Sequence, residues 1–414
     1  MNGIKEHGFE PHLSSFPFGE LHDIRNRNRF ISETIQLRKL SLKNLNASQY
    51  LSSIEPYIAS ELISAQNYTE IKALASHFTG GITSFFGFET RLNSTDARAD
   101  YLFAVSSQRG EREALAQMFT NGSLPEAFRS KKEWQNIGKF AAAWANPSSE
   151  LYHKVLGLWF EFDTAVPSET PVPSIFLQIP SLRIDTQEDI QKCRWLTQTA
   201  LPLLIGQPLT EKMEKRFLHA LQQLPQGSSV IHVASMLSRS VAGVRLVINR
   251  IQPNEIISYL ISLGWTDENN GLTTLIKEIE NIASRIVLHI NITENGVDQK
   301  IGLECAYQKD QYSLETRWES FFDYLIQKNA CTSKKKVTLM SFLGAEQDDN
   351  TSVFDLTSYR AAVRLQNNDF SAALVRYISH IKISYKPNHS IEAKAYPGIR
   401  LFGKNKTNIE ASYQ

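Results

Sequence analysis

The chain has few cysteines and almost no net charge. Three of its 414 residues are cysteines, and none of them belongs to a CxxC spacing. A disulfide framework or a zinc site is therefore not expected, and reduced thiols in a cytosol fit better. Lysine and arginine number 44 against 43 aspartates and glutamates, whereas a nucleic-acid binder usually has a clear basic excess. We expect no nucleic-acid partner.

Hydrophobic runs long enough for a membrane are lacking as well. No apolar stretch approaches the about 20 residues that a spanning helix needs. The first residues, MNGIKEHGFEPHLSSF, contain no hydrophobic region of a secretory signal. We therefore expect a cytoplasmic protein without a membrane partner.

Several familiar catalytic motifs are absent from the sequence. It contains no GxxxxGK[ST], no GxGxxG after a predicted strand, no HExxH and no GxSxG. These absences argue against P-loop enzymes, dinucleotide-binding enzymes, zinc proteases and α/β-hydrolases. Any activity must come from another kind of site.

The sequence does contain five predicted β-hairpins, in each of which two alternating apolar–polar runs are joined by a short connection. Asn295-Gly296 lies in the turn of the fourth, and Asn-Gly is the strongest short-range hairpin signal. The predicted hairpins span 80–107, 154–180, 229–251, 285–307 and 377–399. Segments of helical periodicity separate them, and those before the fifth include SVFDLTSYRAAVRL and DFSAALVRY.

We predict an α+β protein made of five repeated helix–β-hairpin–helix units. Residues 1–78 form an N-terminal arm and helices that pack on a barrel in this prediction. Residues 79–405 form one barrel domain of five units, and residues 406–414 form a tail.

Most of the predicted strands have one apolar and one polar face, because successive side chains point to opposite sides. Leu158 and Phe160 share one face of their strand, and Trp159 and Glu161 share the other. Helices are expected to cover the apolar faces. The polar faces then lie either in water, on an open sheet, or inside an about ten-stranded antiparallel barrel with helices outside. We favour the barrel, since closure removes two exposed edges and leaves a cavity.

Five consecutive helix–strand–strand–helix units with polar side chains inside resemble the ABBA fold of aromatic prenyltransferases. The chain length is similar to that of the dimethylallyl tryptophan synthase branch. The last hairpin, SHIKISYKPNHSIEAKAYPGI, resembles the family's strands that end in a lysine or tyrosine facing the lumen. The resemblance implies a transferase that moves an allylic (prenyl) group from its diphosphate to an electron-rich aromatic small molecule or peptide. It implies no required cofactor and no protein-bound metal; magnesium is allowed but not indicated.

Such a reaction needs cations around the diphosphate, because negative charge accumulates on the leaving group. Polar strand faces offer five candidate donors for this group: Arg245, Lys382, Lys394, His289 and Tyr396.

The allylic cation also needs aromatic surface, and a carboxylate must orient the acceptor and take its proton. Trp159 and Phe176 are the candidates for the aromatic shield, with Tyr396 as a further ring. Glu161 and Glu304 are the candidate catalytic carboxylates, and the resemblance favours Glu161.

Two other functions stay open at this level. Cys305 beside Glu304, with His289, suggests the pentein fold of guanidine-modifying enzymes, but parity places Cys305 on the apolar side and each unit has two strands instead of three. The second alternative is a non-catalytic protein that binds a peptide or small molecule in a sheet or barrel pocket. The all-helical prenyltransferases are disfavoured because no DDxxD sequence is present; Asp348-Asp349-Asn350 comes nearest.

Overall fold

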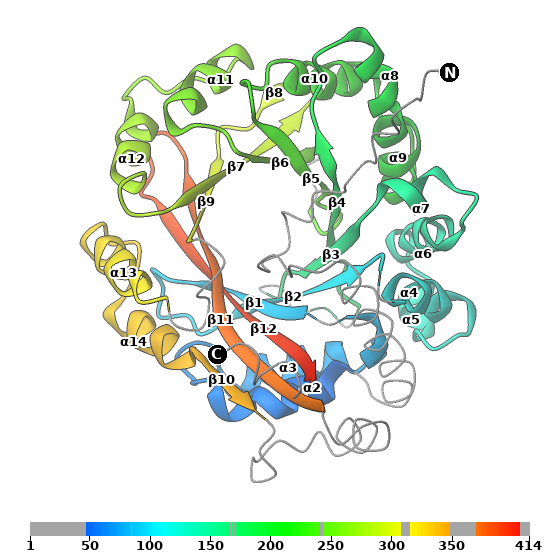
Figure 1. The fold of residues 1–414 in the computed structure, drawn as a ribbon, viewed down its shortest axis with the longest axis vertical. Helices are drawn as coiled ribbons and strands as arrows, with labels where there is room; N and C mark the ends of the chain where they lie inside the picture. Colours follow the sequence, from blue (N-terminus) through cyan, green and yellow to red (C-terminus); the bar gives the residue numbers. More distant parts are fainter. Residues whose placement is uncertain are drawn as a thin grey trace, which may run out of the picture.

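Ten antiparallel strands form a closed barrel in the computed structural model (Figure 1). The structure describes residues 47–83, 85–108, 110–164, 168, 170–239, 243–307, 315–347 and 370–405. The barrel strands are β1 (Phe85–Arg91), β2 (Ala99–Ser106), β3 (Gly157–Phe162), β4 (Ser174–Leu182), β5 (Ser229–Ser235), β6 (Val244–Asn249), β7 (Arg285–Thr293), β9 (Ile301–Ala306), β11 (Phe370–Tyr385) and β12 (Glu392–Asn405). The pairs β12–β1 and β9–β11 close the ring. The predicted α+β class with a closed barrel is confirmed.

Each predicted hairpin contains two strands that pair with each other. Two short strands lie beside this ring: β8 (Gly296–Val297) pairs with β7, and β10 (Gly344–Gln347) pairs with β11.

One helix prediction is wrong. DFSAALVRY (369–377) was expected to be helical, but β11 already begins at Phe370. This segment pairs with β10 on one side and with the far end of β12 on the other, and such tertiary pairing outweighs the helix propensity of its alanines. The predicted helix SVFDLTSYRAAVRL lies outside the described residues.

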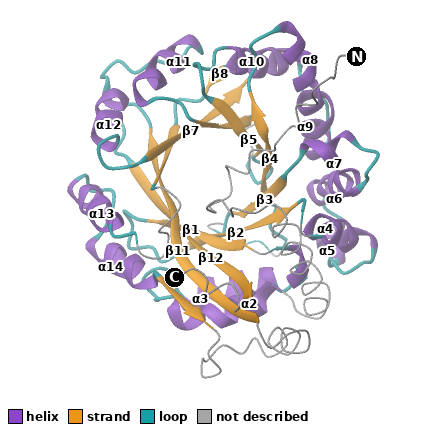
Figure 2. Ribbon diagram, viewed as in Figure 1, coloured by secondary structure: helices purple, strands orange, loops and turns teal. Residues whose placement is uncertain are grey.

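Helices surround the barrel on the outside (Figure 2). Their bounds are α2 (Ala47–Ile54), α3 (Ala65–Ala75), α4 (Glu111–Thr120), α5 (Glu126–Arg129), α6 (Lys132–Ala145), α7 (Glu150–Lys154), α8 (Gln187–Trp195), α9 (Leu201–Ile205), α10 (Glu211–Gln222), α11 (Ile256–Ser262), α12 (Gly271–Ile279), α13 (Arg317–Gln327) and α14 (Ser333–Phe342). No helix among the described residues is both long and apolar enough to cross a membrane.

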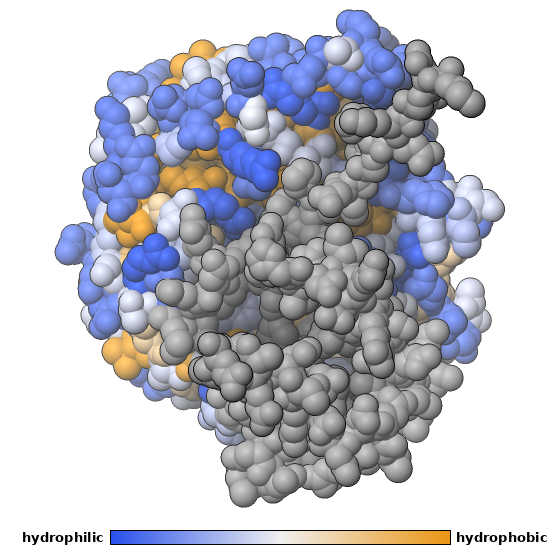
Figure 3. Space-filling view, viewed as in Figure 1, coloured by the Kyte–Doolittle hydropathy of each residue, from blue (hydrophilic) through white to orange (hydrophobic). Residues whose placement is uncertain are grey.

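The main hydrophobic core fills the space between the barrel wall and these helices. Phe103 and Phe160 stack on neighbouring strands with ring centroids 4.9 Å apart, and Trp134 of α6 packs against Phe162. Burial of such side chains is the main stabilising contribution to a layered fold. Hydrophilic residues predominate on the visible outer rim, where the helices lie (Figure 3). The apolar strand faces therefore point outward and the polar faces inward.

The helices α2 and α3 pack on the outer face of β1. Tyr50 and Tyr68 contact the rings of Phe86 and Phe88, and the Tyr68 hydroxyl donates a 2.6 Å hydrogen bond to the Leu51 carbonyl. Residues 1–46 of the predicted N-terminal arm and helices (1–78), and the tail at 406–414, lie outside the described residues, so the predicted domain boundaries remain predictions.

Candidate active site

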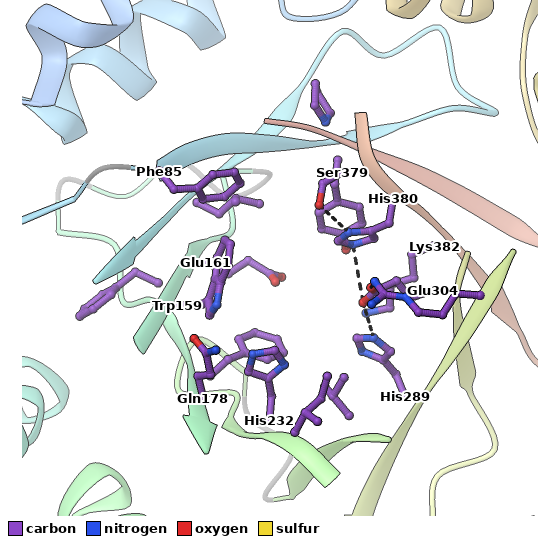
Figure 4. Close-up of a pocket in the computed structure, with 18 of the residues that line it drawn as sticks. Phe85, Trp159, Glu161, Gln178, His232, His289, Glu304, Ser379, His380 and Lys382 are labelled. Carbon is purple, nitrogen blue, oxygen red and sulfur yellow. Dashed lines mark hydrogen bonds and ion pairs between the residues drawn. The ribbon is translucent and has the colours of Figure 1, made fainter. Parts of the chain in front are cut away.

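The inside of the barrel contains a pocket of about 1190 Å³, counting the part that opens to solvent (Figure 4). Two hydrophobic clusters that are separate from the main core contribute apolar residues to its wall. One contains Phe176, Ala234, Met236, Val247 and Val287, and the other contains Phe85, Leu102, Tyr377 and Tyr396. Trp159 packs against both clusters, and its ring meets that of Phe85 edge-on at 4.8 Å.

Two β-bulges turn additional side chains into this pocket. In the β11–β12 pair, Ser379 and His380 together oppose Tyr396, and both line the pocket. The β5–β6 pair shifts register at Ile231, and both Ile231 and His232 line the pocket. A bulge re-aims side chains in this way and is common next to functional sites.

All nine predicted site residues belong to this lumen. Trp159, Glu161, Phe176, His289, Glu304, Lys382 and Tyr396 line the pocket, and Arg245 and Lys394 interact electrostatically with Glu161 and Lys382 beside it. All nine therefore lie on the lumen-facing side of their strands, as the alternation of apolar and polar residues predicted. Their catalytic and binding roles remain predictions.

Glu89 of β1 was not among the residues predicted from the sequence, but it lies at the centre of the charged groups around Lys382 and Lys394. It is 2% exposed and accepts hydrogen bonds from Lys394 and Tyr396 of β12. Burial works to raise the pKa of Glu89, but Lys394 and Lys382 hold it well below its usual range. Burial works to lower the pKa of Lys394, but Glu89 raises it. This carboxylate and this ammonium therefore form an ion pair inside the barrel.

Lys382 differs from Lys394 because it has no hydrogen bond or ion pair within the described residues. Burial, followed by the nearby Arg245, lowers the pKa of Lys382 to about 7, against the opposing effect of Glu161 and Glu89. The Arg245 Nε donates a 2.9 Å hydrogen bond to Asn291 Oδ1, which leaves the terminal nitrogens of the guanidinium without a partner in the described chain. Lys382 and Arg245 are therefore cations available to a ligand.

Glu161 extends from β3 into the pocket on the side opposite Lys382 (Figure 4). No hydrogen bond or ion pair holds it among the described residues. Burial, and then Glu89, raise the pKa of Glu161, while Lys382 and Arg245 oppose this effect. Glu161 is thus a buried carboxyl group that is available to a ligand.

Glu304 of β9 lies in a second polar group of the lumen (Figure 4). Its Oε2 is 3.1 Å from His289 Nε2 and 3.9 Å from His380 Nε2, and its Oε1 is 3.5 Å from the Arg285 guanidinium. Burial works to raise the pKa of Glu304, but His380, His289 and Arg285 hold it well below its usual range. The ring of His380 also stacks on Tyr396 with centroids 4.0 Å apart.

Some of the missed residues had a signal in the sequence. Glu89 and Asp100 are acidic residues in otherwise apolar strands, and they are direct cross-strand neighbours. Two acids in buried strands need a partner or a function. His232 and Tyr377 gave less signal, because the bulges in their strands interrupt the simple alternation of faces.

The residues of the pentein alternative do not converge. Cys305 is fully buried in the outer core, whereas Glu304 and His289 point into the lumen. A thiol on the outside of the barrel cannot act on a ligand inside it. In the described part of the chain, no three histidine, cysteine or acidic side chains are grouped so that they could hold a metal ion.

Comparisons with known proteins found similarity at the level of fold alone. No family model matches the chain, and no curated protein matches it. Solved structures that it resembles include prenyltransferase PriB in its apo form (10% identity, 88% of this chain and 96% of that chain, TM-score 0.46). A second is 5-dimethylallyltryptophan synthase from Streptomyces coelicolor (10% identity, 86% of this chain and 98% of that chain, TM-score 0.48). A third is AnaPT from Neosartorya fischeri (9% identity, 89% of this chain and 94% of that chain, TM-score 0.47). The chain has a remote resemblance to these prenyltransferases, at identities that carry over no residue's role.

Proposed function

We propose that this protein transfers an allylic (prenyl) group from its diphosphate to an electron-rich aromatic acceptor inside the barrel. One observation carries the proposal: cations from distant parts of the sequence meet a carboxyl group and an aromatic wall in one enclosed lumen. Arg245, Lys382 and Lys394 all act electrostatically on Glu161. No cofactor and no metal ion is part of the proposal.

Departure of the diphosphate is the step that the cations assist. When the allylic carbon–oxygen bond breaks, its electron pair stays on the diphosphate, whose negative charge grows. The unpaired Lys382 and the terminal nitrogens of Arg245 are the groups that would bind this charge. Lys394 is already neutralised by Glu89, so its contribution is to keep the local charge balanced.

The allylic cation left behind would need protection from water and from the basic groups of the protein. Trp159, Phe176 and Tyr396 present aromatic faces or edges on the pocket wall. A ring face attracts a cation by about 0.5–2 kcal/mol, more when water is excluded. The closed wall and the apolar clusters beside it would reduce hydrolysis of the donor.

The acceptor would lie between this wall and Glu161. Glu161 has no partner in the described residues, and its carboxylate would stabilise the positive charge that the acceptor ring develops as it attacks the allylic cation. We expect Glu161→Gln to reduce turnover more than it reduces donor affinity, since an amide keeps the shape but cannot hold a negative charge.

The test is incubation with dimethylallyl or geranyl diphosphate and a panel of aromatic acceptors, with prenylated product detected by mass spectrometry. Lys382→Ala should lower turnover at least about tenfold by removing a charge-assisted contact. Lys394→Ala should also lower it about tenfold, because the buried Glu89 loses its partner. Lys215→Ala, on the exposed surface of α10, is the matched control and should turn over normally. Normal rates in both lumen variants would contradict the proposal.

A non-catalytic binding protein is the alternative that this experiment separates. Such a protein would bind aromatic molecules in the same pocket without consuming the diphosphate. Release of diphosphate that depends on both substrates would exclude it.

A further inference from the structure

The lumen has a second polar region that the proposed donor site does not use. Cross-strand pairing places Gln178, His232, Val247 and His289 on four neighbouring strands at one level of the wall. Neighbouring strands are about 4.8 Å apart, so the backbones of the two histidines are about 10 Å apart. An aromatic ring lying over Val247 would be within reach of both imidazoles.

His289 has one ring nitrogen in use and one without a partner. Its Nε2 is 3.1 Å from Glu304 Oε2, whereas its Nδ1 is buried and has no hydrogen-bond partner among the described residues. The residue as a whole is only 8% exposed. A buried polar atom without a partner is costly, which indicates that a ligand or water completes the site.

The contact with Glu304 determines which nitrogen carries the proton. Glu304 is held in its ionised form, so it accepts a hydrogen bond and His289 Nε2 must donate it. Burial, followed by Lys382, lowers the pKa of His289 to about 3, so the imidazole is neutral at physiological pH. In the neutral ring, Nδ1 then has no proton and carries a lone pair. It cannot donate to a phosphate oxygen, but it can accept from an O–H or N–H group.

Gly302 allows this arrangement of side chains. It lies between β7 and β11, and a Cβ atom there would come within 3.0 Å of both His289 Cβ and Lys382 Cε. The missing side chain lets the histidine and the lysine lie side by side on the wall. The imidazole of His289 is therefore adjacent to Lys382 of the proposed donor site.

His232 provides independent support for a ligand in this region. A β-bulge turns it into the same pocket, and its Nε2 is also buried without a partner among the described residues. Burial lowers the pKa of His232 to about 4, so this imidazole is also neutral. Two neutral imidazoles, each with an unpartnered nitrogen, suit an uncharged polar aromatic molecule better than a charged one.

We propose that His289, positioned by Glu304, is the base that removes the proton from an acceptor whose aromatic ring carries an O–H or N–H group, with His232 as a second polar contact. The inference rests on the proposed prenyl transfer and assigns the acceptor end of that site.

The allylic carbon–oxygen bond breaks with its electron pair on the diphosphate, and a ring atom of the acceptor forms the new bond to the allylic carbon. Bond formation leaves the ring cationic and makes its O–H or N–H group strongly acidic, so this proton can pass even to the weakly basic His289 Nδ1, and the imidazolium pairs with Glu304. Where a ring carbon has been prenylated, the hydrogen on that carbon is then lost to water as the O–H or N–H group is re-formed, which restores the aromatic ring. The proton is released to water when the products leave.

A binding experiment tests the site without any turnover. By isothermal titration calorimetry, 2-naphthol should bind wild type at least about tenfold tighter than 2-methoxynaphthalene, which lacks the O–H donor. Indole against 1-methylindole makes the same comparison for an N–H donor and decides which of the two groups is preferred. In His289→Ala and His289→Gln the preference should vanish. His153→Ala, an exposed histidine on α7, should keep it. Equal affinities in wild type for both members of both pairs would overturn the inference.

A kinetic experiment tests the proton transfer. With dimethylallyl diphosphate, His289→Ala should lower kcat about 100-fold, within the usual range for loss of a general base, and leave the donor KM unchanged. Added imidazole should restore part of the rate. Full activity in His289→Ala would show that His289 is not the base, without contradicting prenyl transfer itself. If wild type prefers 2-naphthol to 2-methoxynaphthalene but forms no prenylated product, the acceptor site is supported and prenyl transfer is contradicted.

Discussion

At the scale of single residues, the lumen separates its charges into paired and unpaired groups. Lys394 has Glu89 and Arg285 has Glu304, whereas Lys382 has neither a hydrogen bond nor an ion pair in the described chain. A buried ammonium without a partner loses its hydration uncompensated, which explains why its pKa falls to about 7. An arriving anion would remove that penalty.

The pH dependence of donor binding follows from Lys382. As the pH rises above about 7, more of the empty protein holds Lys382 neutral, so binding a diphosphate must first add a proton. The dissociation constant of dimethylallyl diphosphate should rise between pH 7 and 9 in wild type, by up to about tenfold for each pH unit. Lys382→Arg keeps its charge and should show a weaker dependence in titrations over the same range. Parallel curves for the two proteins would show that Lys382 does not bind the donor.

Asp100 gives a second prediction, for stability. Burial, followed by Glu89, raises the pKa of Asp100 to about 8 in spite of its ion pair with Arg91. Between about pH 4 and pH 8 the folded protein therefore binds more protons than the unfolded chain, so this residue lowers the free energy of unfolding as the pH rises.

Asp100→Asn removes the titrating group and keeps an oxygen for the 2.9 Å hydrogen bond from the Thr164 amide. Relative to wild type, the variant should gain stability from pH 5 to pH 8 in urea denaturation. A constant difference between the two proteins over this range would mean that Asp100 is ionised throughout.

At the scale of strands and helices, the bulges mark where alternation alone stops predicting the site. Simple parity placed Glu161, Lys382 and Lys394 correctly, because apolar and polar residues alternate regularly in the stretch of strand around each of them. It could not place Ser379 and His380 together in the lumen, since consecutive residues of a regular strand face opposite sides. The extra residue of a bulge has no sequence signature here.

The lumen-facing side of strand β1 was difficult to predict from the sequence for a related reason. Its sequence, FFGFETR, is buried on both faces, because Phe86 and Phe88 face the helices while Phe85 and Glu89 face the lumen. With aromatic residues on both sides, the pattern shows an acidic residue in a buried strand but no polar face that would place Glu89 in the lumen. Only the three-dimensional pairing with β12 identifies its partners.

The β1–β12 pair also closes the barrel, and Gly87 sets how closely these strands approach. A Cβ atom on Gly87 would lie 2.6 Å from the Pro397 carbonyl oxygen, so the strands would have to move apart. Gly87→Ala should lower the free energy of unfolding by about 1–3 kcal/mol. Gly81→Ala is the control, because a Cβ there meets nothing within 4 Å. Equal melting temperatures for the two variants would contradict the close approach.

At the scale of the whole molecule, the sequence predicted the five strand pairs and favoured closure, but it could not demonstrate closure. The closing pairs join residues far apart in the chain; Gly87 pairs with Gly398, for example. Nothing local in either segment specifies such a partner. The two extra strands and the long extension of β11 were missed for the same reason, since their pairing is tertiary.

Closure is also what turns scattered polar residues into one site. Arg245, Lys382 and Lys394 lie on three different strands, and they act on the same carboxyl group only because the sheet curves back on itself. On an open sheet each would be an ordinary solvated cation.

The most direct test is therefore the protection that dimethylallyl diphosphate gives against thermal unfolding. At 100 times the dissociation constant, a specific ligand stabilises the folded state by about 2.7 kcal/mol. We predict a rise in melting temperature for wild type and for Lys215→Ala, and little or none for Lys382→Ala and Arg245→Ala. An unchanged melting temperature in wild type, or the same rise in all four proteins, would contradict a diphosphate site built from these converging cations.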